Sequence, residues 1–380
     1  MRRAAAAALG GILLTLVAFT FDASPLFVPG VAFTLVGLAV PGWIALSARG
    51  ATVGRRLHTD RVVEEQPLEA TIVVRRGRFG LPGAEIDDPL AGAPVSVRDA
   101  LSLIRGSRTA KVHIIARFAR RGLRSVPAPT LVVRDPLGLA RTIRPALTTT
   151  QEVLVLPRTE PVRWSEHGPG ERRRLSAPAA PSEPLAAVDV DGLRPYRRGT
   201  PASRIHWPAL ARGVGLLERR LQADGDTRPL VVLDARGSGD GTDLDAAVRA
   251  AASLTLELAR RGGCMLLLPG ERRASTIDAD LAGWEAAHIR LALVEGGPAT
   301  PAPWIGGGAR LGPVFYVAAQ PRDCLPSTPA GTGRRGYVLV VPRELGARMA
   351  ARPSFEVAGC QGFGVRQRAG PQASGQVVAA

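Results

Sequence analysis

The chain has 380 residues, of which 46% are hydrophobic and only 4% aromatic, and its formal net charge is +16. This length is sufficient for two or three domains, whose cores must consist mostly of Leu, Val and Ala. The three cysteines, Cys264, Cys324 and Cys360, are odd in number and far apart, which excludes a secreted disulfide framework and predicts buried free thiols in a reducing compartment.

Two long apolar runs open the chain, at about residues 4–21 and 26–48, and neither contains a basic residue. Each is long enough to cross a hydrocarbon core of about 30 Å, which needs roughly 20 helical residues. Only residues 22–25 separate them, so the sequence predicts an antiparallel transmembrane hairpin within residues 1–50. The alternative is a cleaved signal peptide ending near Ala23, with the second run as an anchor.

Basic residues flank both outer ends of this hairpin: Arg2, Arg3, Arg49, Arg55 and Arg56. Positive charge on both sides predicts that both termini and the soluble domains lie in the cytoplasm, on the inner or plasma membrane. The symmetric pattern favours the hairpin over the signal peptide. An anionic membrane face is also the simplest partner for a basic chain, whose positive charge comes almost wholly from arginine, since Lys111 is the only lysine.

Residues 53–157 have the pattern of strands, with Gly, Pro and Asp between β-branched runs and no helical stripe. The strands are expected at residues 68–74, 111–118, 130–133 and 152–156. This pattern predicts a small β-sandwich of immunoglobulin-like type.

Residues 158–188 are rich in Pro, Arg, Ser and Glu, which predicts an exposed linker. Residues 189–365 form the last predicted domain, and from about Pro229 its pattern is that of an α/β fold with parallel strands and right-handed crossovers. Its strands are expected at 230–233, 264–268, 314–318 and 337–341, and its helices at 243–261 and 279–288. The tail, 366–380, has little to bury and is expected to be disordered.

The segment 191–220, DGLRPYRRGTPASRIHWPALARGVGLLERR, has a dense order of basic, aromatic and glycine residues. It resembles the signature of the bacterial membrane-protein family called domain of unknown function 58. The positions that match are Leu193, Arg194, Tyr196, Gly199, Arg204, Ile205, His206, Trp207, Ala211 and Arg212. The positions that depart from the family pattern are Thr200, Pro208 and Leu210.

The resemblance implies a two-span anchor, a cytoplasmic β-sandwich and a von Willebrand factor A-like α/β domain of three layers. It also implies that the protein acts together with a MoxR-type AAA+ ATPase. We therefore expect a non-enzymatic scaffold or adaptor that has no catalytic residues and no cofactor. Arginine and aromatic residues are enriched at interface hot spots. We therefore expect the partner to bind at Arg194, Tyr196, Arg204, His206, Trp207 and Arg212; a structural strap is the compatible alternative.

A second hypothesis is a metal-dependent ligand-binding module. Von Willebrand factor A-like domains hold a divalent ion with Asp-x-Ser-x-Ser after a strand, and this chain has Asp234-Ala-Arg-Gly-Ser238. Asp234 and Ser238 are the candidate Mg²⁺ ligands. Arg236 replaces the middle serine, and because a guanidinium cannot ligate a cation, loss of the metal is favoured.

A third hypothesis is a hydrolase or transferase that uses His206 as a general base, with Asp189 or Asp191 beside it. The other histidines are scattered and show no metal-ligand spacing. Nucleic-acid binding is not favoured, because the arginines are dispersed over the whole chain.

Overall fold

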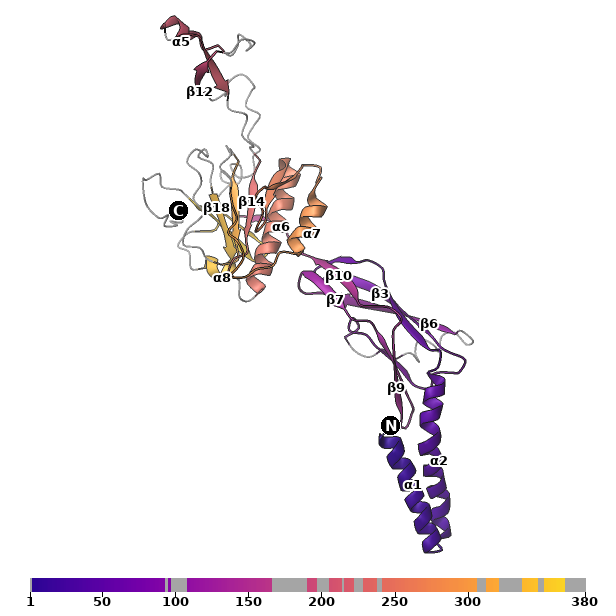
Figure 1. Cartoon of the computed structure of the whole chain (residues 1–380). Helices are drawn as coiled ribbons and strands as arrows, with labels where there is room; N and C mark the ends of the chain where they lie inside the picture. The colour runs from indigo at the N-terminus through magenta and orange to yellow at the C-terminus, as the bar shows by residue number, and fades with distance from the viewer. Residues whose placement is uncertain are drawn as a thin grey trace. The chain divides into compact units, whose positions relative to one another are not determined.

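The computed structural model describes residues 2–92, 95–96, 108–165, 190–196, 205–213, 215–221, 228–237, 241–305, 312–320, 337–347 and 352–365 (Figure 1). The chain divides into two compact units, Met1–Val155 and Leu156–Ala380. The predicted disordered tail, 366–380, lies outside the described residues, as does residue range 166–188 of the predicted linker.

Two apolar helices form a hairpin at the start of the first unit, α1 (Arg2–Thr20) and α2 (Ser24–Ser47). Both are long and apolar enough to cross a membrane, a test that a signal sequence near the N-terminus would also pass. Glycines bring the two helices together. A Cβ on Gly11 would overlap the backbone of Thr34, and one on Gly37 would overlap Ala8. Small residues at the contact therefore permit the close backbone approach that is common between membrane helices.

A β-rich region follows, in which the described residues form three sheets with the strand orders β1-β3-β6, β2-β10-β7 and β5-β4-β8-β9. The first and third are antiparallel throughout, and β10 is antiparallel to β7. The strands are β1 (Thr52–Leu57), β2 (Arg61–Val63), β3 (Pro67–Arg75), β4 (Ala84–Asp87), β5 (Val95–Ser96), β6 (Thr109–Arg117), β7 (Gly122–Val126), β8 (Thr130–Arg134), β9 (Arg141–Pro145) and β10 (Gln151–Leu156). A β-rich region after two apolar helices is what the sequence predicts.

The core of the first unit continues from the β-rich region into α2. Ile44 and Ala48 from the end of α2 are buried in one cluster with Val53, Ile72 and Leu131. The end of α2 is therefore built into this core and is not a free linker.

Arg55 does not contribute to the exposed positive charge that we expected after the second apolar run. Its side chain is fully buried and pairs with the buried carboxylate of Asp88, with Nη1 2.8 Å from Oδ1. It also donates to Gln151 and to the carbonyl of Val126. The sequence could not reveal this, because all three partners lie far along the chain. Arg56, by contrast, is exposed.

The second unit contains a mixed sheet with the strand order β11-β19-β20-β18-β17-β14-β15-β16. Its four central strands, β18, β17, β14 and β15, are parallel. The strands are β11 (Arg163–Trp164), β14 (Leu230–Asp234), β15 (Cys264–Leu267), β16 (Ser275–Ile277), β17 (Val314–Ala318), β18 (Tyr337–Pro342), β19 (Phe355–Val357) and β20 (Cys360–Val365). We call this sheet with its helices the α/β body.

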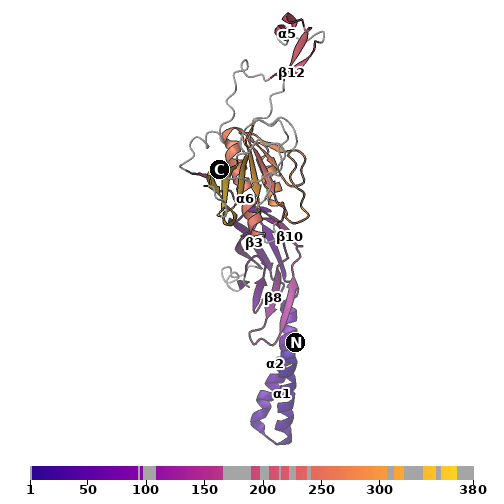
Figure 2. The ribbon, with the colours of Figure 1, turned by 90° about the vertical axis from the view of Figure 1, so that its left-hand side faces the viewer.

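The helix α6 (Thr242–Gly262) packs on this sheet (Figure 2). Its buried face consists of small and branched residues, including Leu244, Val248, Ala251, Leu254 and Leu258, which contact apolar side chains of β14, β15 and β17. The helix ends at Gly262 and Gly263, both with positive φ. The helix and the strands on either side of it lie within two residues of the predicted bounds.

Two other helices are α7 (Trp284–Ala292) and α8 (Arg343–Gly346). The helix predicted at 279–288 begins later, because Gly283 has a φ of 85° and N-caps α7 while the residues before it form turns. The β19-β20 hairpin was not predicted. The first residues of the predicted linker, 158–188, are part of the α/β body and are not an exposed linker. There β11 pairs with β19, and the backbone N–H of Glu160 donates to Ser253.

The segment that resembles the family signature forms a two-stranded β-hairpin that is separate from the eight-stranded sheet. β12 (Val190–Pro195) pairs with β13 (Leu217–Leu221), and the short helix α5 (Trp207–Ala211) lies between them. We call these described residues the signature hairpin.

Cys264 and Cys360 are buried free thiols, and burial raises the pKa of each to about 12, whereas Cys324 lies outside the described residues.

We predict that Arg55→Met destabilises the first unit, because it leaves the Asp88 carboxylate buried without its cation. The expected cost is about 3 to 5 kcal/mol, measured by chemical unfolding of the detergent-solubilised protein. Arg56→Met is the matched control, and this exposed neighbour should change stability by no more than about 0.5 kcal/mol. The double variant Arg55→Met with Asp88→Asn should be more stable than Arg55→Met alone, because it has no buried charge. A double variant that is no more stable would contradict the buried-charge explanation.

Candidate functional site

The candidate site lies at the carboxyl ends of β14 and β17, in the middle of the parallel strands. The strand order reverses here, because β15 pairs with one side of β14 and β17 with the other. Open α/β sheets bind their ligands outside the carboxyl ends of the strands at such a reversal. Asp234, a predicted metal ligand, is the last residue of β14 and therefore lies where a ligand is expected.

Three side chains form a closed cluster at this point. Asp234 is 1% exposed, and its two carboxylate oxygens accept a bidentate pair of bonds from Arg236, at 2.9 Å from Nε and 2.7 Å from Nη2. The hydroxyl of Tyr316, from β17, donates to Oδ2 at 2.6 Å. The backbone N–H of Arg236 also donates to Oδ1. The carboxylate is thus bonded on both oxygens by groups that favour its ionised form.

The ionisation of the cluster follows from these bonds. Burial alone would raise the pKa of Asp234, but the bonds from Arg236 and Tyr316 outweigh it and hold the pKa below the ordinary value of 3.8. The bond to Asp234 raises the pKa of Arg236, and burial together with the same carboxylate raises the pKa of Tyr316. Near neutral pH the cluster is therefore an ion pair with a neutral tyrosine.

This geometry bears on the predicted metal site. A cation at Asp234 would have to displace the guanidinium that is bidentate on its carboxylate. Ser238, the other predicted ligand, lies outside the described residues. Within the ranges that the structure describes, no three or more His, Cys, Asp or Glu side chains are grouped to hold a metal.

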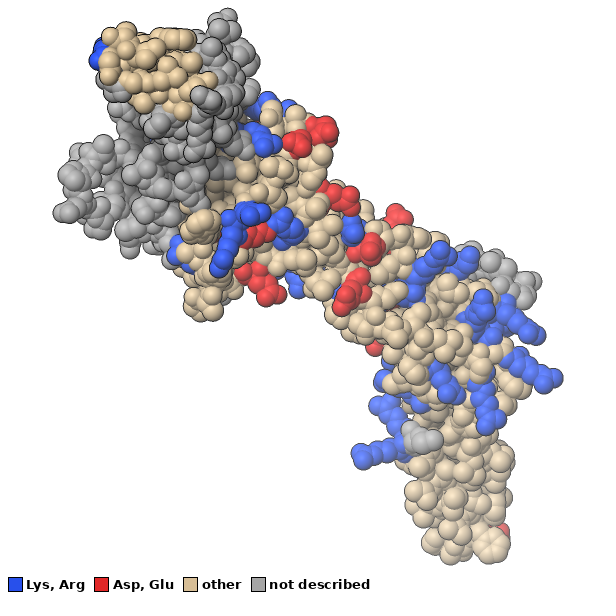
Figure 3. Space-filling view, turned by 45° about the horizontal axis from the view of Figure 1, so that its top comes forward, with Lys and Arg blue, Asp and Glu red and all other residues tan. Residues whose placement is uncertain are grey.

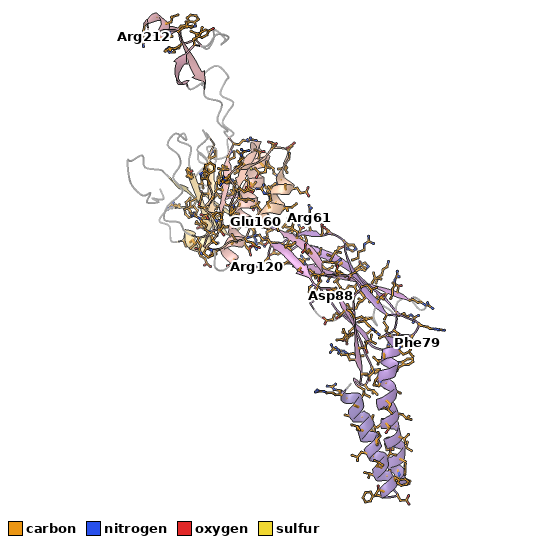
Figure 4. The ribbon with its side chains drawn as sticks, in the orientation of Figure 1. Arg61, Phe79, Asp88, Arg120, Glu160 and Arg212 are labelled. Atoms are coloured by element: carbon orange, nitrogen blue, oxygen red, sulfur yellow. The ribbon has the colours of Figure 1, made fainter. Side chains whose placement is uncertain are left out.

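The predicted partner-binding residues lie on the signature hairpin. Trp207 is 56% exposed, and Arg212 is exposed at the end of α5 (Figure 4). Tyr196 is half-buried, and its backbone N–H donates to the carbonyl of Leu216. Arg194 lies in β12 opposite Glu218, but its side chain and the whole of Arg204 lie outside the described residues.

His206 has a structural role in this hairpin. It is the N-cap of α5, where Nδ1 accepts a bond from the backbone N–H of Ala209 at 3.2 Å. Its own backbone N–H donates to Leu217 in β13. The ring nitrogen that caps the helix is not available as a general base. Asp189 lies outside the described residues, as does the side chain of Asp191.

Sequence reasoning missed Tyr316 and a second polar pair. Tyr316 is the one hydroxyl-bearing residue in the strand VFYVA, a signal that could have marked it as a buried donor. The second pair is Glu271 with Arg290, which lie on an open pocket of about 290 Å³ beside Leu268 and Leu293. The two carry opposite charges and neutralise each other, so the pocket offers no free ionic ligand-binding group from this pair.

Comparisons with known proteins give little further information about this site. No protein-family model and no curated protein matches the chain. Among solved structures, the chain is similar to the CARDB domain of a Pyrococcus furiosus protein, crystallised in complex with di-metal ions. The identity is 15% and the TM-score 0.18, over 28% of this chain and 87% of that one, which supports no argument about fold or metal. The resemblance to domain of unknown function 58 therefore stays a prediction.

We predict that the wild-type protein takes up no Mg²⁺ or Mn²⁺ and that Arg236→Ser gains divalent-ion binding. The substitution removes the guanidinium from Asp234 and turns residues 234–238 into Asp-Ala-Ser-Gly-Ser, a set of hard oxygen ligands. Isothermal calorimetry should give a saturable heat at millimolar Mg²⁺ for the variant alone. Arg260→Ser, at an exposed position of α6, is the control. Saturable heat from the wild-type protein would contradict the closed site.

We also predict that Asp234 stabilises the α/β body only while it is ionised. Its pKa is lower in the folded than in the unfolded chain, so its contribution is present above about pH 4 and is lost as the pH falls below that value. Asp234→Asn should cost about 2 kcal/mol near neutral pH and progressively less in acid. Thermal unfolding of both proteins across this range measures the difference. Glu344→Gln, at an exposed carboxylate, should leave the pH profile unchanged.

Proposed function

We propose that the chain is a membrane-anchored cytoplasmic adaptor, non-enzymatic, that works with a MoxR-type AAA+ ATPase in the assembly or maturation of other proteins. In this proposal α1 and α2 cross the inner or plasma membrane with both termini in the cytoplasm. The exposed Arg2, Arg3, Arg49 and Arg56 beside the outer ends of the helices support that orientation.

The proposal assigns a known class to each soluble part. The β-rich region is an immunoglobulin-like sandwich, which the antiparallel strand pairs of its sheets support. The α/β body is von Willebrand factor A-like. Support for this comes from the parallel strands β15, β14, β17 and β18, the antiparallel β16 beside β15, and the reversal of strand order at β14.

The observation that carries the adaptor function is the exposed apolar surface of the signature hairpin. Trp207, Leu210 and Leu216 are 56%, 41% and 38% exposed, with the exposed Arg212 next to them. Exposed tryptophan and arginine on a folded element are the residue types that dominate binding energy at protein interfaces. The family resemblance implies the ATPase as the partner, and we assign it to this surface.

The same surface is held in one shape by its local structure. Ile205 and Ala209 are buried beneath α5, and His206 caps the helix. A rigid surface loses less conformational entropy on binding than a mobile one. The bidentate bonds on Asp234 and the capping role of His206 also favour the adaptor over a metal-dependent module or a His206-dependent hydrolase.

The test is affinity capture of the tagged full-length protein from gently solubilised native membranes with an ATP analogue, read by mass spectrometry. We expect near-stoichiometric recovery of an AAA+ ATPase. Trp207→Ala with Arg212→Glu should weaken capture by at least about 30-fold, as expected for loss of a hot spot of about 2 kcal/mol.

The matched control is Trp304→Ala with Arg260→Glu, which changes an exposed tryptophan and an exposed arginine of the α/β body. This variant should capture the ATPase as the wild-type protein does. Circular dichroism of both variants checks that the domains remain folded. Recovery of lipid and chaperones alone, or equal capture by all three proteins, would refute the proposed role of the signature hairpin.

A further inference from the structure

A second charged surface lies in the first unit, where the apolar helices meet the β-rich region. Four arginines surround this junction, and we call them the basic collar: Arg3, Arg49, Arg78 and Arg141, all exposed. They come from the start of α1, the end of α2, the β3–β4 loop and the start of β9.

Close contacts join these four segments in two pairs. Gly77, next to Arg78, is so close to the carbonyl of Arg49 that a Cβ there would overlap it. Arg3 Nη1 lies 3.8 Å from the position of a Cβ on Gly138, in the β8–β9 turn. The β3–β4 loop therefore lies against the end of α2, and the β8–β9 turn lies beside the start of α1.

The helix packing places this level at the end of the apolar hairpin. Gly37 in α2 contacts Ala4 and Ala8 near the start of α1. Beyond Gly37, α2 no longer faces α1, and Ile44 packs into the core of the β-rich region. If the hairpin is inserted, the hydrocarbon ends on this side between the start of α1 and the end of α2, the stretch that the basic collar surrounds.

Apolar side chains are exposed at the same level. Trp43 in α2 is 52% exposed and meets Phe79 edge-on, with ring centroids 6.4 Å apart (Figure 4). Leu137 is 68% exposed at the tip of the β8–β9 turn. Aromatic rings and leucine beside arginine are typical of a surface that lies in the headgroup region of a bilayer.

The turn that presents Leu137 is held rigid by Asp135. Its carboxylate is buried and accepts bonds from the backbone N–H groups of Leu137 and Ala140 at 2.9 and 2.6 Å. Burial raises the pKa of Asp135, but these bonds outweigh it and lower the pKa overall. The acid nearest the exposed leucine is thus occupied by backbone groups.

The charges of the collar are not neutralised by any residue in the part of the chain that the structure describes. Among the described residues, none of the four arginines makes an ion pair, whereas Arg134 nearby pairs with Glu85. In Figure 3 basic side chains gather over the β-rich region next to an almost uncharged hairpin. Exposed arginines without an ion pair, beside an apolar surface at a membrane boundary, are attracted to the anionic headgroup layer.

We propose that the basic collar docks the β-rich region on the anionic phospholipid headgroups of the leaflet that α1 and α2 leave. The proposal rests on the insertion of the hairpin under the proposed function. The arginines bind the phosphates, while Trp43, Phe79 and Leu137 enter the headgroup boundary. Docking at this level fixes the first unit against the membrane surface.

The test uses the full-length protein in nanodiscs of equal parts phosphatidylcholine and phosphatidylglycerol. Native mass spectrometry measures the ratio of the two lipids that remain bound after release. The wild-type protein should retain phosphatidylglycerol in preference. In the triple variant Arg49→Gln, Arg78→Gln and Arg141→Gln, the preference for phosphatidylglycerol should fall by about fivefold for each arginine lost. The preference of the wild-type protein should also fall as the salt concentration rises.

The matched control replaces three exposed arginines of the β-rich region: Arg61→Gln, Arg120→Gln and Arg124→Gln. Arg61 and Arg120 lie at the end of this region away from the hairpin (Figure 4). This variant has the same net charge as the collar variant and should keep the wild-type preference. Equal preferences in the collar variant and the wild-type protein, or equal losses in both variants, would overturn the proposal.

Alkaline carbonate extraction of the protein from vesicles of the same lipids distinguishes the two proposals. Release of the wild-type protein would show that the hairpin is not inserted, which overturns both. Retention of the protein without a preference for phosphatidylglycerol would overturn the basic collar and leave the membrane anchor standing.

Discussion

The bidentate bond between Arg236 and Asp234 determines what the α/β body can bind at its most favourable position. Strand topology brings the end of β14 to the reversal of strand order, where folds of this kind hold ligands. In this chain an internal cation is already bonded to the only carboxylate that β14 contributes, and Tyr316 occupies the same oxygen. The charge of Asp234 is neutralised within the protein, so this edge of the sheet holds a stabilising ion pair.

The same physical reasoning separates the three hypotheses for function. A metal-dependent module needs Asp234 free, and a general base needs the capping nitrogen of His206 free, but both groups already have partners. An exposed apolar surface lies elsewhere, on the signature hairpin, where Trp207 is exposed on a capped helix. Binding through a presented surface accords better with this distribution of partners than chemistry in a pocket.

The first unit combines two environments in one helix. Up to Gly37, α2 contacts α1 through small residues, and beyond it Ile44 and Ala48 enter a core made by strands. A helix that ends inside a folded core transmits its position to that core without a flexible linker. For this reason the exposed arginines and Trp43 around the junction have a defined level relative to the hairpin.

Local patterns in the sequence were sufficient for the elements whose signal is periodic or apolar. The two N-terminal helices, the β-rich region and the helix α6 with its flanking strands are found where expected, because apolar content, β-branched runs and a helical stripe are properties of neighbouring residues. Arg236, at the middle position of Asp234-Ala-Arg-Gly-Ser238, was also visible in the sequence and argued there against a cation at Asp234, whereas its bidentate bond to that carboxylate came from the structure.

Long-range partners were decided by the tertiary structure alone. The sequence could not show that Arg55 is buried with Asp88, that Tyr316 closes the cluster at Asp234, or that β11 joins the sheet through β19. It also could not distinguish the capping role of His206 from a catalytic one. In each case the deciding contact joins a side chain or strand to an element whose position depends on the packing of the whole domain, and local spacing carries no information about that position.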